Sequence, residues 1–320
     1  MIPQFAVSAI FFACLSVLVL WTDCDLFLRV LPYSPADKSF SNQIIWVIGA
    51  SSGIGASLAE ELTLGGAQVV LSARRMNHLE DVANKCALLG HRPMVVPFDV
   101  LDFSEHEKSY QLIIEKFGRI DVLVLNAGRS QRAIAMNTEI IDTRELMELN
   151  FMSFVSLTKI ALPPMISRES GQIVILSSLA GKIGTPISSS YSATKFALHG
   201  YFDALRAEVS FKNVNIQLVC PGPVESEISM HSVRGENTKV SVEEKKMPTA
   251  RCTHLMARAM KWRLDEIWIS NQPYLVICYL HTYMPFISRQ LFKHFIGPGR
   301  VKTLAAGGDI YSLKNILGGR

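Results

Sequence analysis

Short apolar runs alternate with longer amphipathic segments along most of the chain. The runs are rich in β-branched residues and predict strands, while an apolar residue at every third or fourth position predicts helices between them. The expected strands are 43–48, 68–72, 94–98, 121–125, 172–176, 214–219 and 266–270, and the expected helices include roughly 76–89, 105–117, 143–166, 191–211 and 251–263. This alternation favours right-handed βαβ units. We therefore predict an α/β domain over residues 43–270, with a doubly wound, mostly parallel seven-stranded sheet.

The N-terminal segment has a different pattern. Residues 1–22 contain no charged side chain, and residues 5–21 are almost entirely apolar. A helix of this length spans roughly 30 Å, which is enough to cross a bilayer. A cleaved signal peptide would need a basic start and a small-residue cleavage site, and both are poor here. We predict an uncleaved membrane anchor over residues 1–22 and a linker over residues 23–42.

The C-terminal extension, residues 271–320, is apolar and then basic. Residues 274–287 contain no Asp, Glu, Lys or Arg and a single histidine, His281, and residues 285–320 carry six Lys or Arg against Asp309 alone. A helix docked on the domain or in a dimer interface explains this pattern as well as a segment lying on a bilayer surface does. The whole-chain net charge of +4 is too small to indicate a nucleic-acid partner, and six scattered cysteines give no metal-ligand spacing.

A glycine-rich turn follows the first expected strand. Gly49, Gly53 and Gly55 stand between that strand and an apolar helical pattern, with Ser51, Ser52 and Ile54 among them. Glycines at this point allow the backbone to approach a pyrophosphate at the N-terminus of a helix. The spacing is Gly-x3-Gly-x-Gly, and by itself it fits an ordinary βα loop equally well.

The next strand ends give further cofactor candidates. Arg74 and Arg75 stand where an acidic residue would bind the ribose 2′-hydroxyl of NAD, so they favour the 2′-phosphate of NADP(H) over a merely solvated helix start. Asp99, followed by Val100, could accept a hydrogen bond from an adenine amino group or cap the next helix. The small residues of Asn126-Ala127-Gly128 would let the backbone pass close to a ribose.

Four polar residues suggest acid/base chemistry at a carbonyl group. Tyr191 and Lys195 are four residues apart, so a helix presents them on one face, and a nearby ammonium lowers the pKa of a phenol. Ser178 ends the strand before them and could hold a carbonyl oxygen. Asn150 interrupts an apolar helical pattern, which indicates a polar site beside it.

The ordered set Gly49-xxx-Gly53-x-Gly55, Asp99-Val100, Asn126-Ala127-Gly128, Asn150, Ser178, Tyr191-xxx-Lys195 and Pro221-Gly222 resembles the classical short-chain dehydrogenase/reductase family. The resemblance implies a Rossmann-like fold and a catalytic tetrad of Asn150, Ser178, Tyr191 and Lys195. In it, Tyr191 is the acid/base, Ser178 positions the substrate oxygen, Lys195 binds the nicotinamide ribose and Asn150 holds a relay water. The interval of thirteen residues to the tyrosine favours Ser178, with Ser177 as the alternative.

The resemblance also assigns cofactor contacts after the sixth strand, to Pro221, Gly222, Val224 and Ser226, where Ser226 replaces a more usual threonine. Ile48 likewise stands where the family usually has threonine. Residues 225–247 are expected to form a substrate loop.

Further segments, such as Thr249-Ala-Arg-Cys252 and Glu266-Ile-Trp-Ile-Ser270, resemble a group of membrane-bound enzymes of the endoplasmic reticulum within the family. They imply an NADP(H)-dependent oxidoreductase acting on lipophilic carbonyls such as retinoids, steroids and xenobiotic ketones, for which a homodimer is one expected assembly. The alternative is a dinucleotide-binding scaffold or redox sensor without turnover. Binding alone does not require Ser178 beside Tyr191, which argues against it.

Overall fold

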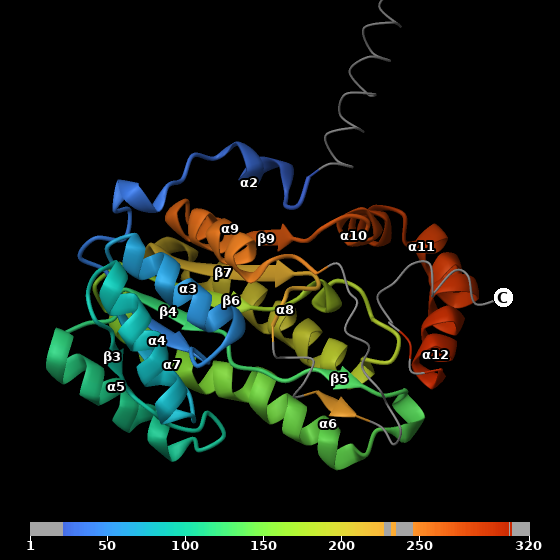
Figure 1. Ribbon diagram of the computed structural model, residues 1–320, viewed down its shortest axis with the longest axis horizontal. Coiled ribbons are helices and arrows are strands. Elements are labelled where there is room, and N and C mark those ends of the chain that lie inside the picture. Colours follow the sequence, from blue (N-terminus) through green and yellow to red (C-terminus); the bar gives the residue numbers. More distant parts are fainter. Residues whose placement is uncertain (1–21, 227–231, 235–245, 307, 309–320) are drawn as a thin grey trace, which may run out of the picture.

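The computed structural model describes residues 22–226, 232–234, 246–306 and 308. Its centre is a parallel sheet of seven strands in the order β3-β2-β1-β4-β6-β7-β9 (Figure 1). The strands are β1 (Ile44–Ile48), β2 (Gln68–Ser72), β3 (Met94–Val95), β4 (Val122–Leu125), β6 (Gly171–Leu176), β7 (Val214–Pro221) and β9 (Glu266–Ile269). The predicted doubly wound sheet is confirmed. A separate pair, β5 (Gln131–Arg132) and β8 (Val233–Arg234), lies beyond the carboxyl ends.

Helices cover both faces of the sheet because strand side chains alternate between them. In β1, Ile45 and Val47 pack with α3 (Gly53–Leu64), α4 (Met76–Leu89) and α9 (Thr249–Lys261). Trp46 and Ile48 pack on the other face, with α5 (Ser104–Phe117), α7 (Ser153–Ser167) and α8 (Ser189–Val209). The inner strands are therefore buried from both sides, which explains why they are continuous apolar runs in the sequence.

The third strand is shorter than predicted. Only Met94 and Val95 form β3, whereas the sequence predicted a strand to residue 98. The amides of Val96 and Phe98 still donate to Leu71 O and Ala73 O, so the chain follows β2 without regular pairing. The difference lies at the sheet edge, where one side of the strand has no partner.

The helix predicted over residues 143–166 is longer and irregular. It consists of α6 (Ile140–Met147), a π-helical turn (Glu148–Met152) and α7, with two prolines inside α7. Among the described residues, Ile140–Ser167 is the stretch whose length and composition would suffice to cross a membrane. Phe154, Leu157 and Met165 are buried in the core against the sheet, so packing within the domain accounts for this apolar character.

Residues 22–42 are part of the folded domain. The backbone of Cys24 pairs with Ile269 of β9 in an isolated antiparallel β-bridge. Leu28 of the short helix α2 (Leu26–Val30) is fully buried. The expectation of a linker over residues 23–42 is thus wrong, because this segment pairs with and packs on the last strand. The predicted anchor over residues 1–22 lies outside the described residues except for Thr22.

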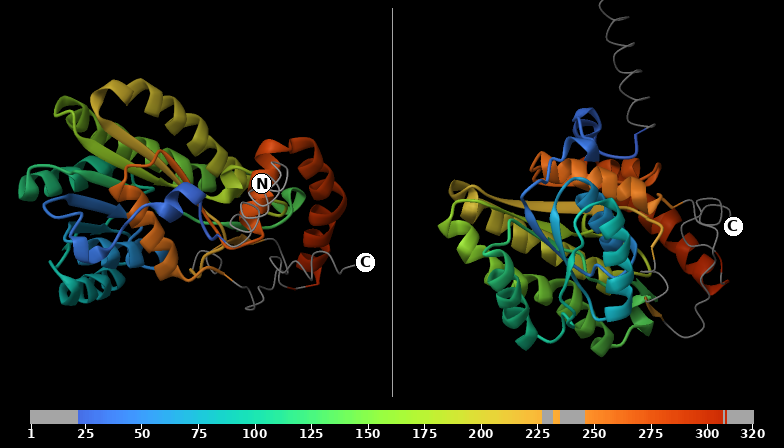
Figure 2. Two further views of the ribbon diagram at one scale, coloured as in Figure 1. Left: turned by 90° about the horizontal axis from the view of Figure 1, so that it is seen from above. Right: turned by 60° about the vertical axis from the view of Figure 1, so that its left-hand side comes forward.

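The C-terminal extension folds into helices at the carboxyl edge of the sheet. These are α10 (Tyr274–Tyr283), α11 (Pro285–Leu291), a π-helical turn (Phe292–Ile296) and α12 (Gly297–Ala305). Figures 1 and 2 show them together at one end of the molecule, beyond the arrowheads of β7 and β9. Most of the expected substrate loop over residues 225–247 lies outside the described residues, as does the chain after residue 308.

Candidate active site

Two hollows adjoin at the carboxyl edge of the sheet, the place where open parallel sheets bind ligands. The first, of about 520 Å³, lies over the ends of β1, β2 and β4, and the second, of about 200 Å³, lies between β6, β7, α8 and the C-terminal helices. Ile54, Asn126, Gly128, Leu176 and Ser226 line both. The two hollows are therefore parts of one site, which we call the dinucleotide groove and the substrate cavity.

Most of the predicted cofactor residues lie together in the dinucleotide groove. Its lining includes Gly49, Ser51, Ser52, Gly53, Ile54, Arg74, Arg75, Asp99, Val100, Asn126, Ala127, Gly128 and Ser226. Pro221, Gly222 and Val224 line the substrate cavity instead. Gly55 lines neither, because it packs beneath the turn, where a Cβ would lie 2.2 Å from Gly49 O.

The glycine turn is shaped by close backbone contact with the end of β4. Gly49 has a φ of +79°, and a Cβ there would lie 2.7 Å from the Ala127 backbone. Asn126 Nδ2 donates a 2.8 Å hydrogen bond to Gly49 O, which ties the two strand ends together. A turn with bare backbone at the N-terminus of α3 is the shape that a pyrophosphate requires. The residues present therefore fit a dinucleotide.

The two arginines approach the groove differently. Arg75 Nη2 donates to Ser51 Oγ at 3.2 Å and to Ser52 Oγ at 3.0 Å, so its charge lies beside the glycine turn. Arg74 is exposed, and its Nη1 lies 3.7 Å from Asp99 Oδ2. Asp99 also accepts from the Leu101 amide at 3.0 Å, so it shapes a turn. Both arginines line the dinucleotide groove.

Tyr191 and Lys195 line the substrate cavity from the first turns of α8. Lys195 Nζ lies 5.7 Å from the centroid of the Tyr191 ring and donates a 2.7 Å hydrogen bond to Leu176 O. Burial lowers the pKa of the Lys195 ammonium from 10.5 to about 7. The lysine is thus held under the tyrosine, where its positive charge would favour the phenolate.

The two serines at the end of β6 have different surroundings. Ser178 is half-buried, accepts from the Ala180 amide at 3.1 Å and donates to Pro221 O at 3.3 Å. Ser177 is almost fully buried, and its Oγ lies 3.1 Å from His199 Nε2. Both line the substrate cavity, but Ser178 is the more exposed of the two residues. This geometry favours Ser178 as the residue that holds a substrate oxygen.

Asn150 lies in the π-helical turn and is fully buried. Its Oδ1 accepts from the Arg129 amide, and its Nδ2 donates to Arg129 O and to Thr194 Oγ1, at 3.0–3.1 Å. A π-helical turn displaces one residue from the regular helix and often marks a functional site. Asn150 lines neither hollow, and it joins the loop after β4 to the turn of α8 that lies between Tyr191 and Lys195.

Comparisons with known proteins agree with this geometry. Residues 43–237 match the family model described as short chain dehydrogenase. The chain is 43% identical over 278 residues to human "Dehydrogenase/reductase SDR family member 7". The aligned region covers 84% of this chain and 82% of the relative. This chain belongs to the short-chain dehydrogenase/reductase family.

Two solved structures show the same fold. A short-chain dehydrogenase/reductase from Burkholderia phymatum in complex with NAD is 21% identical, with a TM-score of 0.70 over 79% of this chain and 96% of that one. A metagenomic short-chain oxidoreductase in complex with NADP is 27% identical, with a TM-score of 0.59 over 72% and 96%. The present protein is therefore a short-chain oxidoreductase by family and by fold.

One residue that positions the helix carrying Tyr191 and Lys195 in this short-chain dehydrogenase was not predicted from the sequence. Gln131 Oε1 accepts from the amides of Ser190 and Tyr191, at 2.7 and 3.2 Å, so it caps the start of α8. An N-cap normally precedes its helix directly. Here the cap comes from β5, almost sixty residues earlier, so local sequence carried no signal for it.

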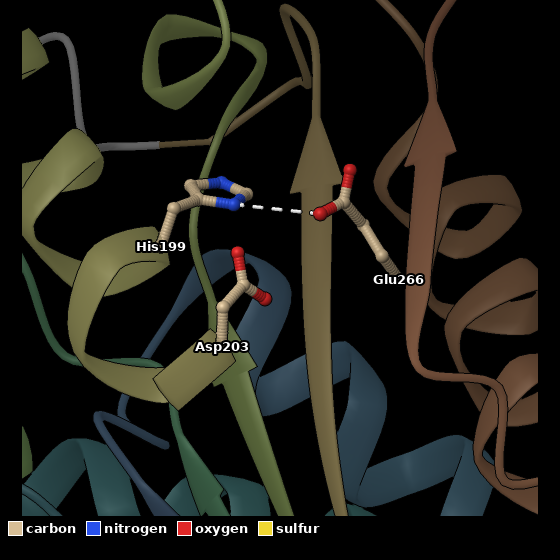
Figure 3. A group of neighbouring side chains, drawn as sticks. All are labelled: His199, Asp203 and Glu266. Carbon is tan, nitrogen blue, oxygen red and sulfur yellow. Dashed lines mark ion pairs between the residues drawn. The ribbon is translucent and has the colours of Figure 1, made fainter. Parts of the chain in front are cut away.

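His199 is a second residue that the sequence did not reveal. It follows Lys195 by one turn of α8, and its Nδ1 lies 3.4 Å from Glu266 Oε2, as Figure 3 shows. Burial acts to raise the pKa of Glu266, but hydrogen bonds from His199, Trp268 and Lys182 outweigh it and lower that pKa to about 2. Glu266 is therefore a half-buried anion close to the His199 side chain that contacts Ser177.

His199, Asp203 and Glu266 could each offer a metal ligand. However, Lys182 Nζ lies 3.0 Å from Glu266 Oε1, and Arg206 Nη1 lies 2.6 Å from Asp203 Oδ1. Both carboxylates thus already have a cationic partner. We interpret the cluster as an ion-pair network that braces α8 against β9.

Proposed function

We propose that the protein is an NADP(H)-dependent oxidoreductase that transfers hydride between nicotinamide and the carbonyl or hydroxyl carbon of a lipophilic substrate. The observation that carries this proposal is the placement of Ser178, Tyr191 and Lys195 around one cavity that opens onto the dinucleotide groove. A cofactor in the groove and a substrate in the cavity would therefore meet at the phenol of Tyr191.

In the reductive direction, the Ser178 hydroxyl donates a hydrogen bond to the ketone or aldehyde oxygen and orients it. Tyr191 transfers its phenolic proton to that oxygen, and the Lys195 ammonium stabilises the phenolate that remains. The nicotinamide, when bound, supplies the hydride to the carbonyl carbon. Asn150 holds the backbone of Arg129 and the hydroxyl of Thr194, and so keeps the catalytic turn of α8 in place.

The preference for NADP(H) over NAD(H) is supported by the charge at the end of β2. Arg74 and Arg75 both line the groove there. The position holds no carboxylate that would accept a hydrogen bond from a ribose 2′-hydroxyl, and a guanidinium matches the oxygens of a 2′-phosphate. Arg75 is already oriented by the two serines of the glycine turn.

The choice of a lipophilic carbonyl is supported by the walls of the substrate cavity. Apolar side chains from five elements or loops line it: Leu179, Ile183, Val224, Ile277, Phe292 and Ile296. Retinoids, steroids and xenobiotic ketones or aldehydes have the apolar surface that such walls bury. The uncharged residues 1–22 support a membrane anchor, and we propose the endoplasmic reticulum as the membrane concerned. A homodimer is part of the same proposal.

The decisive experiment replaces Tyr191 with Phe. We expect Tyr191→Phe to abolish NADPH-dependent reduction of retinal, steroid ketones and quinones, while NADPH binding measured by fluorescence stays near the wild-type value. Tyr201→Phe is the matched control, because Tyr201 lies on the same helix but packs on Phe151 and Phe202 away from the cavity. Turnover by Tyr191→Phe would contradict the mechanism. A wild-type protein that binds NADPH without turnover would support the scaffold alternative.

A further inference from the structure

Large apolar side chains are exposed where α10 meets α11. Tyr283, Met284, Phe286 and Ile287 have exposed fractions of 76%, 52%, 74% and 47%, respectively. We call these four residues the C-terminal corner. Single exposed apolar residues are common on protein surfaces, whereas neighbouring ones usually mark a surface that binds something. Leu291 and Phe295, also exposed, extend the apolar surface along α11 and the turn after it.

The charged side chains on the C-terminal helices themselves all have one sign. Arg289, Lys293 and Lys302 are exposed on the same helices, and residues 271–306 contain no Asp or Glu. An apolar surface with basic residues beside it complements a bilayer with anionic headgroups, in which apolar side chains enter the interface and cations remain at the headgroups. Tyrosine, here Tyr283, is favoured at the level of the headgroups, and phenylalanine, here Phe286, is typical of the apolar face of an interfacial helix.

The chain outside the described structure joins the domain beside the same helices. Gln272 Nε2 donates to Thr22 O at 3.1 Å, and Tyr279 OH of α10 donates to Asp25 Oδ1 at 2.6 Å. The uncharged residues 1–21 therefore connect to the domain next to α10. A segment long enough to cross a bilayer is tied to the part of the fold that carries the corner.

The inner side of these helices faces the substrate cavity. Tyr274 and Ile277 of α10, together with Phe292 and Ile296 of the following turn, line it. The same short segment of chain thus carries an apolar wall of the cavity on one side and an exposed apolar surface on the other.

We propose that the C-terminal corner docks on the surface of an anionic lipid bilayer, so that the wall of the substrate cavity lies beside the membrane. Docking itself is independent of the enzymatic activity. The consequence for substrate entry from the bilayer rests on the function proposed above.

The docking test uses the full chain in a Cys14→Ser background, since the other five cysteines are buried. Phe286→Cys carries an environment-sensitive NBD label, and Leu88→Cys is the control, because Leu88 is 88% exposed on α4, away from the C-terminal helices. The proteins are reconstituted in phosphatidylcholine vesicles with and without phosphatidylserine. We expect the emission of the label at 286 to shift to the blue and to be quenched by doxyl-labelled lipid, more strongly with phosphatidylserine. The label at 88 should keep the emission spectrum of a label exposed to water.

Two results would overturn the docking proposal. One is a label at 286 that shows neither a blue shift nor quenching by doxyl-labelled lipid when phosphatidylserine vesicles are present. The other is a blue shift that needs no lipid and grows with protein concentration, which would make the occupant of the corner a second copy of this chain. Neither readout depends on turnover, so a failure of the proposed activity would be recognised separately.

The consequence for entry is tested with the double variant Phe286→Glu/Ile287→Glu, whose residues do not line the cavity. We expect turnover of a retinoid aldehyde delivered in vesicles to fall severalfold, and turnover of a water-soluble aromatic aldehyde to stay unchanged. An equal loss for both substrates would show a general defect and contradict entry from the membrane.

Discussion

The hydroxyl of Ser177 lies 3.1 Å from Nε2 of His199, two turns along α8 from Tyr191. One turn earlier on the same helix, Lys195 Nζ binds Leu176 O. Residues 191, 195 and 199 share one helix face because they are spaced by four. Leu176 and Ser177, at the end of β6, are thus hydrogen-bonded to that face of α8. These bonds fix the position of the next residue, Ser178, relative to Tyr191.

This relationship predicts that His199 positions the catalytic serine. His199→Leu removes a partner from the buried Ser177 and from the half-buried Glu266, so the free energy of unfolding should fall by about 1–3 kcal/mol. Displacement of Ser178 should also lower kcat by at least about tenfold. Steady-state kinetics and thermal denaturation check both values.

Two further variants separate positioning by His199 from a general loss of stability. His199→Gln can still bond the Ser177 hydroxyl and should recover most of kcat. Asp203→Asn, one turn further on the exposed side of α8, should resemble the wild type. A His199→Leu enzyme with wild-type kcat at a temperature where it is folded would contradict the prediction.

The buried ammonium of Lys195 predicts a pH dependence of stability. Its pKa is about 7 in the folded chain and near 10.5 in the unfolded chain. Between these values the unfolded state binds more protons, so the contribution of Lys195 to the free energy of unfolding rises with pH. Relative to Lys195→Met, the wild type should therefore gain stability as the pH is raised from 7 to 10. Urea denaturation at several pH values measures the difference, and a constant difference would refute the prediction.

The arginines at the end of β2 predict the cofactor preference. Arg75→Ala removes a charged group that lies beside Ser51 and Ser52, so KM for NADPH should rise by roughly 10- to 100-fold, the value of one or two charge-assisted hydrogen bonds. KM for NADH should hardly change. Arg74→Asp should shift the preference toward NADH, because a carboxylate repels a 2′-phosphate.

Arg92→Ala is the matched control for these substitutions. Arg92 bonds Asn84 and Glu80 and does not line the groove. If NADPH and NADH kinetics changed in parallel in the Arg74 and Arg75 variants, the arginines would have no part in recognition of the 2′-phosphate.

The N-terminal segment predicts a contrast between two adjacent residues of α2. Leu28 is fully buried, so Leu28→Ala should lower the free energy of unfolding by about 2–5 kcal/mol. Phe27 is 64% exposed, and Phe27→Ala should change it by less than about 0.5 kcal/mol. Chemical denaturation checks both, and a neutral Leu28→Ala would mean that residues 22–42 contribute little to the domain.

Local patterns predicted the body of the fold well. The bounds of β2 and α4 agree with the predicted 68–72 and 76–89, because each element is delimited by its own periodicity and by the turn residues around it. The carboxyl ends of successive parallel strands must meet at one edge, so the glycine turn, Ser178 and the Tyr191–Lys195 pair could be assigned to one site before any contact was known.

Contacts between distant parts of the chain could not be predicted in this way. Cys24 pairs with Ile269, and Gln131 caps α8, yet neither residue has a local signal because its partner lies far away in the sequence. The apolar segment after residue 274 likewise gave no indication of which side of its helices would face the substrate cavity.

By itself, the sequence determined which side chains gather at the carboxyl edge of the sheet, since residue types and spacing within each βα unit dictate which groups reach that edge. Only the tertiary structure decided how those groups are held, because burial and long-range hydrogen bonds exist once the strands are assembled. The low pKa of Lys195 results from its burial in that assembly. The contact between the Ser177 hydroxyl and His199 likewise forms only when β6 and α8 are packed together.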